Sequence, residues 1–332
     1  MNKDINLDGK TILITGGTGS FGQAFVSNLL NNHKPKKIII YSRDELKQHE
    51  MSEDDLIQNN KKIVRFFLGD VRDVERLELA MREVDIVVHA AAIKHIAAAE
   101  YNPFECIKTN VHGAENIVIA AFRAGVSKVI ALSTDKAANP INLYGASKLA
   151  AEKIFVAARS LAGSYKTSFS IVRYGNVIGS RGSVVPYFKK AIKDKSKNIP
   201  ITDPRMTRFW ITLDNGVDFV LSSLEMSSGA EIFVPKLPSM KIIDIAKAMA
   251  PEREIKITGI RPGEKIHETM ITQDESRNTI ELDDRFVILP QEETYKEKHP
   301  ISYLGKYMNE NTSYSSDNND LWLSIEQFRE MI

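Results

Sequence analysis

The segment from Ser133 to Lys148, STDKAANPINLYGASK, contains the side chains best suited to chemistry. Tyr144 and Lys148 stand four positions apart, so on a helix they share one face. An ammonium beside the phenol, together with a bound cationic nicotinamide, would lower the tyrosine pKa from its ordinary value of about 10. The tyrosinate could then act as a base near neutral pH, and Thr134 could hydrogen-bond the same substrate hydroxyl. Such pairs also arise by chance on amphipathic helices, so position in the fold decides the meaning.

A glycine-rich turn lies near the start of the chain, where Thr15 to Gly22 reads TGGTGSFG. It follows an expected strand and opens an expected helix, which is the context of a dinucleotide-binding turn. Glycines there permit a tight turn and the approach of a pyrophosphate to the helix N-terminus. Two spacings fit, one using Gly17 and one using Gly16, each followed by Gly19 and Gly22. The alternative is a turn used only for packing.

The end of the second expected strand carries a cation in the stretch YSRDELKQ. In dinucleotide folds this position meets the adenosine ribose, where a carboxylate binds a free 2′-hydroxyl and an arginine pairs with a 2′-phosphate. Ser42 and Arg43 suit the phosphate, and Lys47 could add a second positive charge. We therefore expect NADP in preference to NAD. In the alternative, Arg43 is a solvated loop charge paired with Asp44 or Glu45.

Alternating elements place these residues. Buried-strand patterns alternate with helical spacing, which predicts an α/β fold of Rossmann type, a doubly wound parallel sheet with helices on both faces. The expected strands are 11–15, 37–41, 63–68, 85–89, 128–133 and 168–172, and the expected helices between them include 21–30, 74–84 and 105–124. Asp70 and Val71, at the end of the third strand, are expected at the adenine, although such an Asp is also a common turn or cap residue.

The rhythm of alternating elements breaks after about Gly175. We expect residues 1–175 to form the NADP-binding domain and residues 176–332 to form mainly a smaller substrate-binding lobe, with possible return segments to the sheet. Helices are expected at 213–224 and 242–250. The polar stretch 309–320 could be a disordered tail. The apolar residues beyond it predict that the end docks back onto the protein: Leu321, Trp322, Leu323 and Phe328.

Composition limits the possible partners and compartment. The chain has 332 residues, with 43% hydrophobic and 26% charged residues and a net charge of +1, which gives no electrostatic reason to expect nucleic acid. The single cysteine, Cys106, cannot form an internal disulfide, and the apolar run Val84 to Ile93 is too short to span a bilayer. We expect a cytoplasmic protein without membrane insertion. The seven histidines show no ligand spacing, so no metal site is expected.

Taken together, these segments resemble the extended short-chain dehydrogenase/reductase superfamily. Within it, the match is to the inverting UDP-N-acetylglucosamine 4,6-dehydratases that start pseudaminic-acid-type pathways. The resemblance runs from about Gly9 to Pro290 and, less closely, through YSSDNND. It rests on TGGTGSFG, SRDELK, STDKAANP, YGASK, RYGN and RPGEK. It implies NADP as cofactor, UDP-N-acetylglucosamine as substrate and a homo-oligomer, a dimer or larger.

The resemblance also implies roles for particular residues. The second glycine spacing would bind NADP, and Thr134, Asp135 and Lys136 would face the sugar. One departure is Ala97, where the family pattern has proline, which leaves the shape of that loop open. The expected cofactor-binding set is Gly16, Thr18, Gly19, Ser20, Phe21, Gly22, Ser42, Arg43, Lys47, Asp70, Val71, Ala90, Lys94, Tyr144, Lys148 and Val177. The expected substrate-binding set is Lys94, His95, Asn176, Arg205, Arg208, Arg261 and Glu264.

Asp135 and Lys136 also make chemical sense for this reaction. A ketone formed at C4 acidifies the C5 hydrogen, and loss of the C6 hydroxyl then needs a base at C5 and an acid at the departing oxygen. Retaining dehydratases of the superfamily have Asp-Glu at this place. The hypothesis is that Lys136 reprotonates C5 from the opposite face and gives the L-arabino product, provided that burial and the cofactor's charge hold it near a neutral pKa. In the structural alternative Asp135 is a cap and Lys136 a surface charge.

The arginines of the second half could neutralise a diphosphate. They are Arg205, Arg208 and Arg261, and each could equally form a structural ion pair. Arg261 with Glu264, at the start of an expected helix, is the better candidate, because the carboxylate could take the ribose hydroxyls.

Two other functions fit parts of the pattern. A nucleotide-sugar 4-epimerase needs Tyr144 and Lys148 but no acid–base pair at 135 and 136. A non-catalytic NADP-sensing module would keep the glycines and Arg43 but has no use for Tyr144 with Lys148.

Overall fold

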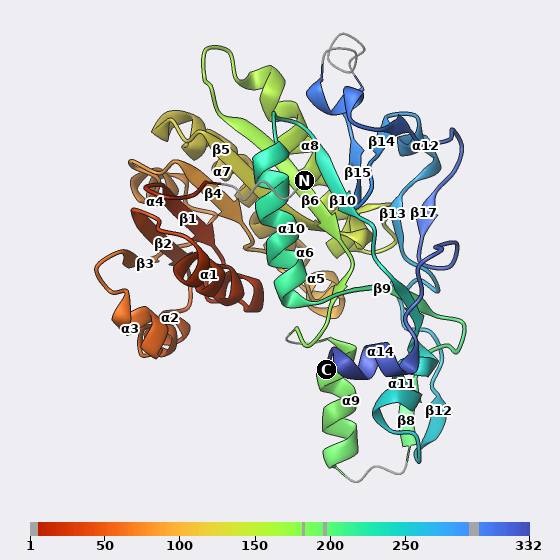
Figure 1. The fold of residues 1–332 in the computed structure, drawn as a ribbon. Coiled ribbons are helices and arrows are strands. Elements are labelled where there is room, and N and C mark those ends of the chain that lie inside the picture. Colours follow the sequence, from red (N-terminus) through yellow and green to blue (C-terminus); the bar gives the residue numbers. More distant parts are fainter. Residues whose placement is uncertain (1–5, 181–182, 195–197, 292–298) are drawn as a thin grey trace.

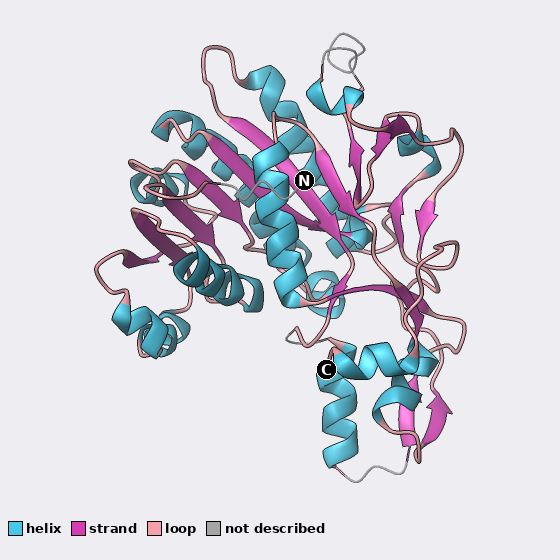
Figure 2. Ribbon diagram, in the orientation of Figure 1, coloured by secondary structure: helices cyan, strands magenta, loops and turns pink. Residues whose placement is uncertain are grey.

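The chain folds around one large sheet with a smaller set of elements at one end (Figure 1). The computed structural model describes residues 6–180, 183–194, 198–291 and 299–332. Figure 2 shows helices on both faces of the sheet, and Figure 1 shows α1 and α10 together on one of them. The predicted α/β class with a Rossmann-type parallel sheet is confirmed.

Seven strands of the large sheet run parallel, in the order β10-β6-β5-β4-β1-β2-β3. Their β-branched residues are buried because helices cover both faces. The parallel strands are β1 (Thr11–Thr15), β2 (Lys37–Ser42), β3 (Val64–Leu68), β4 (Ile86–His89), β5 (Lys128–Thr134), β6 (Ser168–Tyr174) and β10 (Ile232–Pro235). The sequence therefore predicted the first six of these strands to within about two residues.

Three antiparallel strands from the end of the chain extend this sheet beyond β10. They are β15 (Arg285–Ile288), β14 (Thr279–Glu281) and β16 (Lys306–Tyr307). Segments beyond residue 175 thus form four strands of the large sheet among the described residues. The division of the chain into domains at residue 175 stays a prediction.

Several helices of the large sheet begin at side-chain caps, and α1 begins at the glycine turn. Asp44, Asp73 and Asn142 cap α2, α4 and α8 through their side chains, whereas Gly19 opens α1 with no side-chain cap. The helices are α1 (Ser20–Asn32), α2 (Glu45–Ser52), α3 (Asp55–Asn59), α4 (Val74–Ala80), α5 (Ile96–Tyr101), α6 (Pro103–Ile107), α7 (Gly113–Ala124), α8 (Leu143–Leu161) and α10 (Leu213–Met226).

Two expected helices differ from the structure. The helix expected over 74–84 ends at Ala80, and Glu83 has a positive φ of 58°, which a helix does not accommodate. The single helix expected over 105–124 is interrupted, because Lys108–His112 forms a π-helical turn between α6 and α7. Local spacing does not distinguish a π-turn from continuous α-helix.

The smaller part has its own apolar core. Trp210 and Phe328 lie at its centre with ring centroids 5.6 Å apart. Its helices are α9 (Val184–Lys193), α11 (Ile242–Met249) and α14 (Ile325–Glu330). Its strands are β7 (Asn176–Val177), β9 (Thr207–Ile211), β11 (Ser239–Lys241), β8 (Asn198–Ile201) and β12 (Glu254–Ile257). Burial of Phe328 and the bridge from Ser239 to Trp322 confirm that the C-terminal segment docks back.

A further strand pair joins the smaller part to the large sheet. β13 (Thr269–Ile271) pairs with β17 (Tyr314–Ser315), and α12 (Gln273–Ser276) follows β13. No helix among the described residues is long and apolar enough to cross a membrane.

Candidate active site

A cavity of about 1420 Å³ lies at the carboxyl ends of the central parallel strands. Residues from the glycine turn, from β5 and from α8 line it together with the loop around Arg261. Ligands of doubly wound folds bind at this edge of the sheet. The structure thus gathers residues from distant parts of the sequence around one space.

The glycine turn approaches backbone so closely that side chains would not fit. Gly16 has a φ of 66°, and a Cβ on it would lie 2.9 Å from the backbone nitrogen of Ala91. A Cβ on Gly22 would lie 2.4 Å from the carbonyl oxygen of Gly17. Gly16, Gly19 and Gly22 line the cavity, which favours the second of the two expected spacings. Because α1 begins here without a side-chain cap, its free N–H groups suit a pyrophosphate.

The two cations after β2 line the cavity and have local carboxylate partners. Arg43 Nη1 lies 3.5 Å from Asp70 Oδ2, and the Arg43 side chain is 53% exposed. Lys47 Nζ contacts Asp44 Oδ2 at 2.5 Å. Arg43 thus pairs with Asp70, whereas the alternative expected a pair with Asp44 or Glu45. An exposed pair at 3.5 Å is weak, so Arg43 can turn to an anion in the cavity.

Asp70 does not line the cavity, whereas its neighbour Val71 does. Burial raises the pKa of the Asp70 carboxyl, but hydrogen bonds from Arg72 and the charge of Arg43 outweigh it and hold the pKa below its usual range. Asp70 thus serves as the carboxylate that orients two arginines, and its carbonyl accepts a hydrogen bond from the Tyr41 hydroxyl. The Asp70 side chain is thus held beside the cavity by its arginine contacts, and its expected contact with adenine stays a prediction.

Tyr144 and Lys148 lie on the first turns of α8 and both line the cavity. Burial raises the pKa of Tyr144 to about 12, while the ammonium of Lys136 and a hydrogen bond with Thr134 oppose the rise. Lys136, rather than Lys148, is therefore the protein cation that favours the tyrosinate. The expected lowering of the pKa is not produced by the protein's own residues.

Lys148 is a buried ammonium, and among the described residues no carboxylate forms an ion pair with it. Its Nζ donates a hydrogen bond of 2.6 Å to the carbonyl of Leu132. Burial lowers the pKa of Lys148 to about 8, and the charge of Glu152 opposes this. A lysine with this pKa exchanges its proton near neutral pH.

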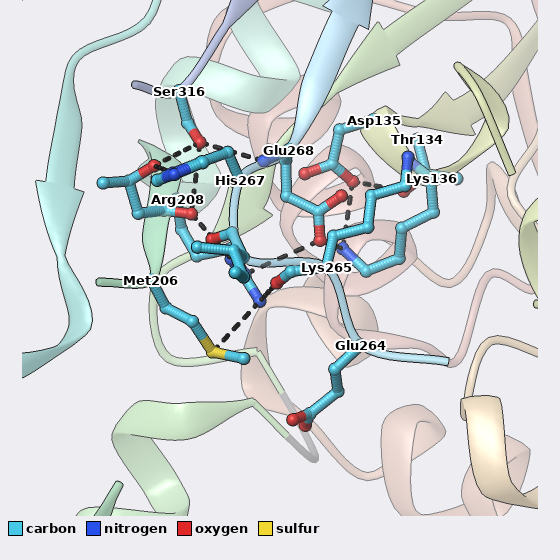
Figure 3. Close-up of polar contacts among 12 residues, drawn as sticks. Thr134, Asp135, Lys136, Met206, Arg208, Glu264, Lys265, His267, Glu268 and Ser316 are labelled. Carbon is cyan, nitrogen blue, oxygen red and sulfur yellow. Dashed lines mark hydrogen bonds and ion pairs between the residues drawn. The ribbon is translucent and has the colours of Figure 1, made fainter. Parts of the chain in front are cut away.

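Lys136 lies between two carboxylates (Figure 3). Its Nζ is 3.0 Å from Asp135 Oδ1 and 3.2 Å from Glu268 Oε1. Thr134 Oγ1 donates to the same Asp135 oxygen at 2.8 Å, and Thr134 and Lys136 line the cavity. Asp135 itself is buried behind them and does not line it.

This arrangement changes one condition of the stereochemical hypothesis. Burial lowers the pKa of Lys136, but the charges of Asp135 and Glu268 outweigh burial and raise the pKa above its ordinary value. The protein's own residues therefore do not hold Lys136 near a neutral pKa, because Glu268 supplies a second carboxylate that the sequence did not reveal. Lys136 is held as an ammonium, which is the protonated acid.

The structure does not bring the side chains of Arg205 and Arg208 to the cavity. Arg205 is exposed and pairs with Asp203 at 2.8 Å. Arg208 is buried, and its guanidinium donates to the carbonyls of Thr207, Lys265 and Ile266. These two arginines therefore form structural contacts within the smaller part.

The loop that carries Arg261 and Glu264 is a turn and not the expected helix. Gly263 has a φ of 77°, and its carbonyl accepts a hydrogen bond of 2.8 Å from Asn142 Nδ2. Arg261 and Glu264 both line the cavity and lie 3.8 Å apart. Asn142 also caps α8, so it ties this loop to the helix that carries Tyr144.

The remaining predicted residues of the site all line the cavity, and their roles stay predictions. Lys94, His95, Asn176 and Val177 line the cavity, and so does Ala97. The other predicted lining residues are Thr18, Ser20, Phe21, Ser42 and Ala90.

Sequence reasoning missed Glu268 and Asn142. Asn142 had a local signal, since an Asn before a helix is a common N-cap. Glu268 follows RPGEK by three residues but had no local signal, because its partner Lys136 is far away in the chain. Among the described residues, no group of three His, Cys, Asp or Glu side chains could hold a metal ion.

A parallel Rossmann-type sheet, a glycine turn at its edge and a Tyr-x-x-x-Lys pair after the fifth strand define the short-chain dehydrogenase/reductase class. The family model described as polysaccharide biosynthesis protein matches residues 12–290. An inverting UDP-N-acetylglucosamine 4,6-dehydratase of Campylobacter jejuni is 57% identical over 330 residues, which cover 98% of each chain. A UDP-glucose 4-epimerase of Rickettsia bellii is 45% identical over 82% of this chain and 81% of its own.

A solved structure is also similar to this chain over nearly its whole length. The X-ray structure of Pen from Bacillus thuringiensis matches with a TM-score of 0.88 and 36% identity, covering 98% of each chain. The chain belongs to the polysaccharide biosynthesis protein family and, within it, to the group of the inverting UDP-N-acetylglucosamine 4,6-dehydratases.

Proposed function

We propose that this protein is an inverting UDP-N-acetylglucosamine 4,6-dehydratase that works with NADP. One observation carries the proposal: Lys136, paired with Asp135, lines the cavity beside Thr134 and Tyr144. A hydroxyl oxidised at C4 needs only the tyrosine, whereas removal of water across C5 and C6 needs a further acid and base. The close similarity to named inverting dehydratases supports the same activity.

Tyr144 is the proposed acceptor of the C4 hydroxyl proton, and Thr134 orients that hydroxyl. The phenol needs help because burial raises its pKa to about 12. The ammonium of Lys136 lowers the cost of the tyrosinate, and Lys148 adds a buried cation on the same helix face. Bound NADP would supply the hydride acceptor and later return the hydride.

Asp135 and Lys136 are the proposed base and acid for the C5 and C6 chemistry. Lys136 reaches the cavity, whereas Asp135 lies behind it and would receive the C5 proton through the Thr134 hydroxyl that donates to it. Lys136 would give its proton to the departing C6 oxygen and would then take one back from the protonated Asp135 that it contacts. As an ammonium, Lys136 can donate a proton to C5 from the opposite face. The product would be UDP-2-acetamido-2,6-dideoxy-β-L-arabino-hex-4-ulose.

The preference for NADP rests on the cations after β2. Ser42, Arg43 and Lys47 line the cavity beyond the glycine turn, where the 2′-phosphate of NADP would lie. Identification of the dinucleotide released from the denatured protein tests this, and NAD as the released species would contradict it.

Incubation with UDP-N-acetylglucosamine tests the activity. Loss of one water in the mass of the sugar nucleotide supports the dehydratase, and solvent deuterium at C5 of an inverted product supports the stereochemistry. A sugar nucleotide of unchanged mass but altered configuration would instead support a 4-epimerase. The similarity to the Rickettsia enzyme is the reason to test for this outcome. No change would support an NADP-sensing module.

A homo-oligomer, a dimer or larger, is also proposed. Tyr101 and Phe104 are 87% and 78% exposed on neighbouring short helices, which is typical of an association surface. Light scattering of the purified protein gives the mass in solution, and a monomer would contradict the proposal.

A further inference from the structure

Glu268 is a buried carboxylate directly before β13, on the strand pair that joins the smaller part to the large sheet, and it contacts Lys136. Its side chain is only 3% exposed, and its Oε1 lies 3.2 Å from Lys136 Nζ (Figure 3). The second contact of Lys136 is Asp135, its own chain neighbour. Glu268 is therefore the only carboxylate among the described residues that pairs with Lys136 from outside the 133–148 segment.

Glu268 is fixed by contacts that have no direct part in the cavity. Its N–H donates to Ser316 Oγ at 2.9 Å, and the N–H of Ser316 donates to the Glu268 carbonyl at 2.8 Å. Arg208 Nε lies 3.6 Å from the Glu268 carboxylate, while its guanidinium also holds the carbonyls before it. Ser316 thus holds the backbone of Glu268, and Arg208 lies beside its carboxylate.

Without Glu268 the charges around Lys136 would be strongly positive, because Arg208 and Lys265 lie at the same site. Two carboxylates, Asp135 and Glu268, face two cations, Lys136 and Arg208. One oxygen of each carboxylate, Asp135 Oδ2 and Glu268 Oε2, is buried without a hydrogen-bond partner. Such oxygens are costly to bury, and the shared ammonium offsets this cost.

Two further titratable groups act on the same site. Tyr144 lies close enough for its ionisation to respond to Lys136, and Lys265 responds to Lys136, Asp135 and Glu268. Lys265 Nζ is itself held by the carbonyl of Ala138 at 2.7 Å. Among these groups, only the two carboxylates attract the ammonium of Lys136.

We propose that Glu268 is a positioning residue that fixes the ammonium of Lys136 in the cavity and thereby sets the face from which C5 is reprotonated. If Lys136 were bound only to Asp135, the residue next to it in the chain, its ammonium could adopt several positions in the cavity. A second carboxylate on the far side restricts it to one place. The stereochemical part of this inference rests on the proposed function.

The pairing can be tested without turnover. An amine reacts with acetic anhydride only in its neutral form, so the labelling rate of Lys136 at pH 8.5 reports its protonation, and peptide mass spectrometry reads it residue by residue. In Glu268→Gln the rate is expected to rise roughly tenfold or more, because a lost opposite charge lowers a lysine pKa by about 1 unit or more. Glu268→Asp should return most of the way to the wild-type rate.

The stereochemical part is tested by product analysis at early time points in deuterated buffer. Glu268→Gln should lower kcat by roughly 10- to 100-fold, less than full loss of an acid–base group, with KM within about twofold. Its product should contain both C5 configurations, whereas wild type gives the inverted one. Glu268→Asp should restore mainly the inverted product.

Glu281→Gln is the matched control, since Glu281 pairs with Lys236 at 2.8 Å on the far edge of the sheet. It should change neither the labelling rate of Lys136 nor the product.

An unchanged labelling rate in Glu268→Gln overturns the pairing, and a purely inverted product at wild-type kcat overturns the stereochemical role. If Glu268→Gln does not fold, Arg208→Lys, which loosens the hold on the Glu268 carboxylate, should change the labelling rate and the product ratio in the same direction by a smaller amount. A wild-type protein that removes no water would defeat the proposed function while leaving the labelling result standing.

Discussion

Arg173 and Lys136 each lie between two carboxylates, and the two clusters differ in burial and in bonding. Arg173 of β6 bonds Glu152 of α8 and Glu275 of α12. Lys136 bonds Asp135 and Glu268. Arg173 is fully buried, whereas the Lys136 side chain is 20% exposed and opens on the cavity.

The two clusters differ in how many carboxylate oxygens the cation hydrogen-bonds. The guanidinium of Arg173 donates to all four oxygens of Glu152 and Glu275 and to the carbonyl of Met270. The Lys136 ammonium leaves one buried oxygen of each of its carboxylates without a partner. A planar fork locks two carboxylates in place, while a single ammonium leaves room for a proton to move.

In both clusters the paired charges outweigh burial. Burial lowers the pKa of Arg173 and of Lys136, but the neighbouring carboxylates raise both above their ordinary values. Only the lysine can give up its proton in a reaction, since an arginine keeps its own. The first cluster is therefore structural and the second is suited to chemistry.

Removal of the Arg173 guanidinium should have the largest effect. Arg173→Met leaves Glu152 and Glu275 buried without their cation, so the free energy of unfolding should fall by about 3–5 kcal/mol. Urea denaturation measures it. Arg277→Ala, which removes an exposed pair with Asp274, should change the same quantity by less than about 1 kcal/mol. A small loss of unfolding free energy in Arg173→Met would mean that this cluster does not stabilise the fold as described above.

Exchange of the Lys136 ammonium for a guanidinium should separate charge from proton transfer. Lys136→Arg keeps the cation between the carboxylates, so the free energy of unfolding should stay within about 1.5 kcal/mol. Because a guanidinium does not release its proton, kcat for loss of water should fall by roughly 100-fold or more. Mass spectrometry of the sugar nucleotide measures the rate. Retention of more than about a tenth of the activity would exclude Lys136 as proton donor.

Burial lowers the pKa of Lys148, for which no carboxylate among the described residues forms an ion pair. Its folded pKa of about 8 lies below the unfolded value, so the unfolded chain binds more protons between about pH 8 and 10.5. Stability of the wild type relative to Lys148→Met should therefore be lowest below pH 8 and rise by up to ~3 kcal/mol towards pH 10.5. Urea denaturation of both proteins at pH 7 and pH 10 tests the sign. A difference that does not change with pH would contradict the lowered pKa.

Ser133 should have the smallest effect, since it adds one bond to an already paired carboxylate. Ser133 Oγ donates to Glu152 Oε1, which also accepts from Arg173 Nε. Ser133→Ala should lower the free energy of unfolding by about 1–2 kcal/mol. Ser52→Ala, which removes an exposed bond to the carbonyl of His49, is the control and should cost less than about 0.5 kcal/mol. Equal losses in both variants would mean that Ser133 does not contribute to the Arg173 cluster.

The sequence predicted the large sheet well because its strands are continuous buried runs. The run at Lys37–Ser42 and the run at Thr11–Thr15 need no distant information to be read as strands. Helix ends were less well predicted. The π-helical turn at Lys108–His112 and the non-helical turn at Gly263 depend on packing and on a positive φ that spacing does not reveal.

The chain by itself determined which reactive groups stand together locally. Thr134, Asp135 and Lys136 are neighbours, and Tyr144 and Lys148 share a helix face, so covalent geometry and helical periodicity were enough. Only the tertiary structure decided that Lys136 has a second carboxylate, because Glu268 arrives from a distant segment. It also decided that Arg208 is structural, since its guanidinium bonds carbonyls within its own part of the fold. Contacts between distant segments follow from the packing of whole elements, and no local spacing encodes them.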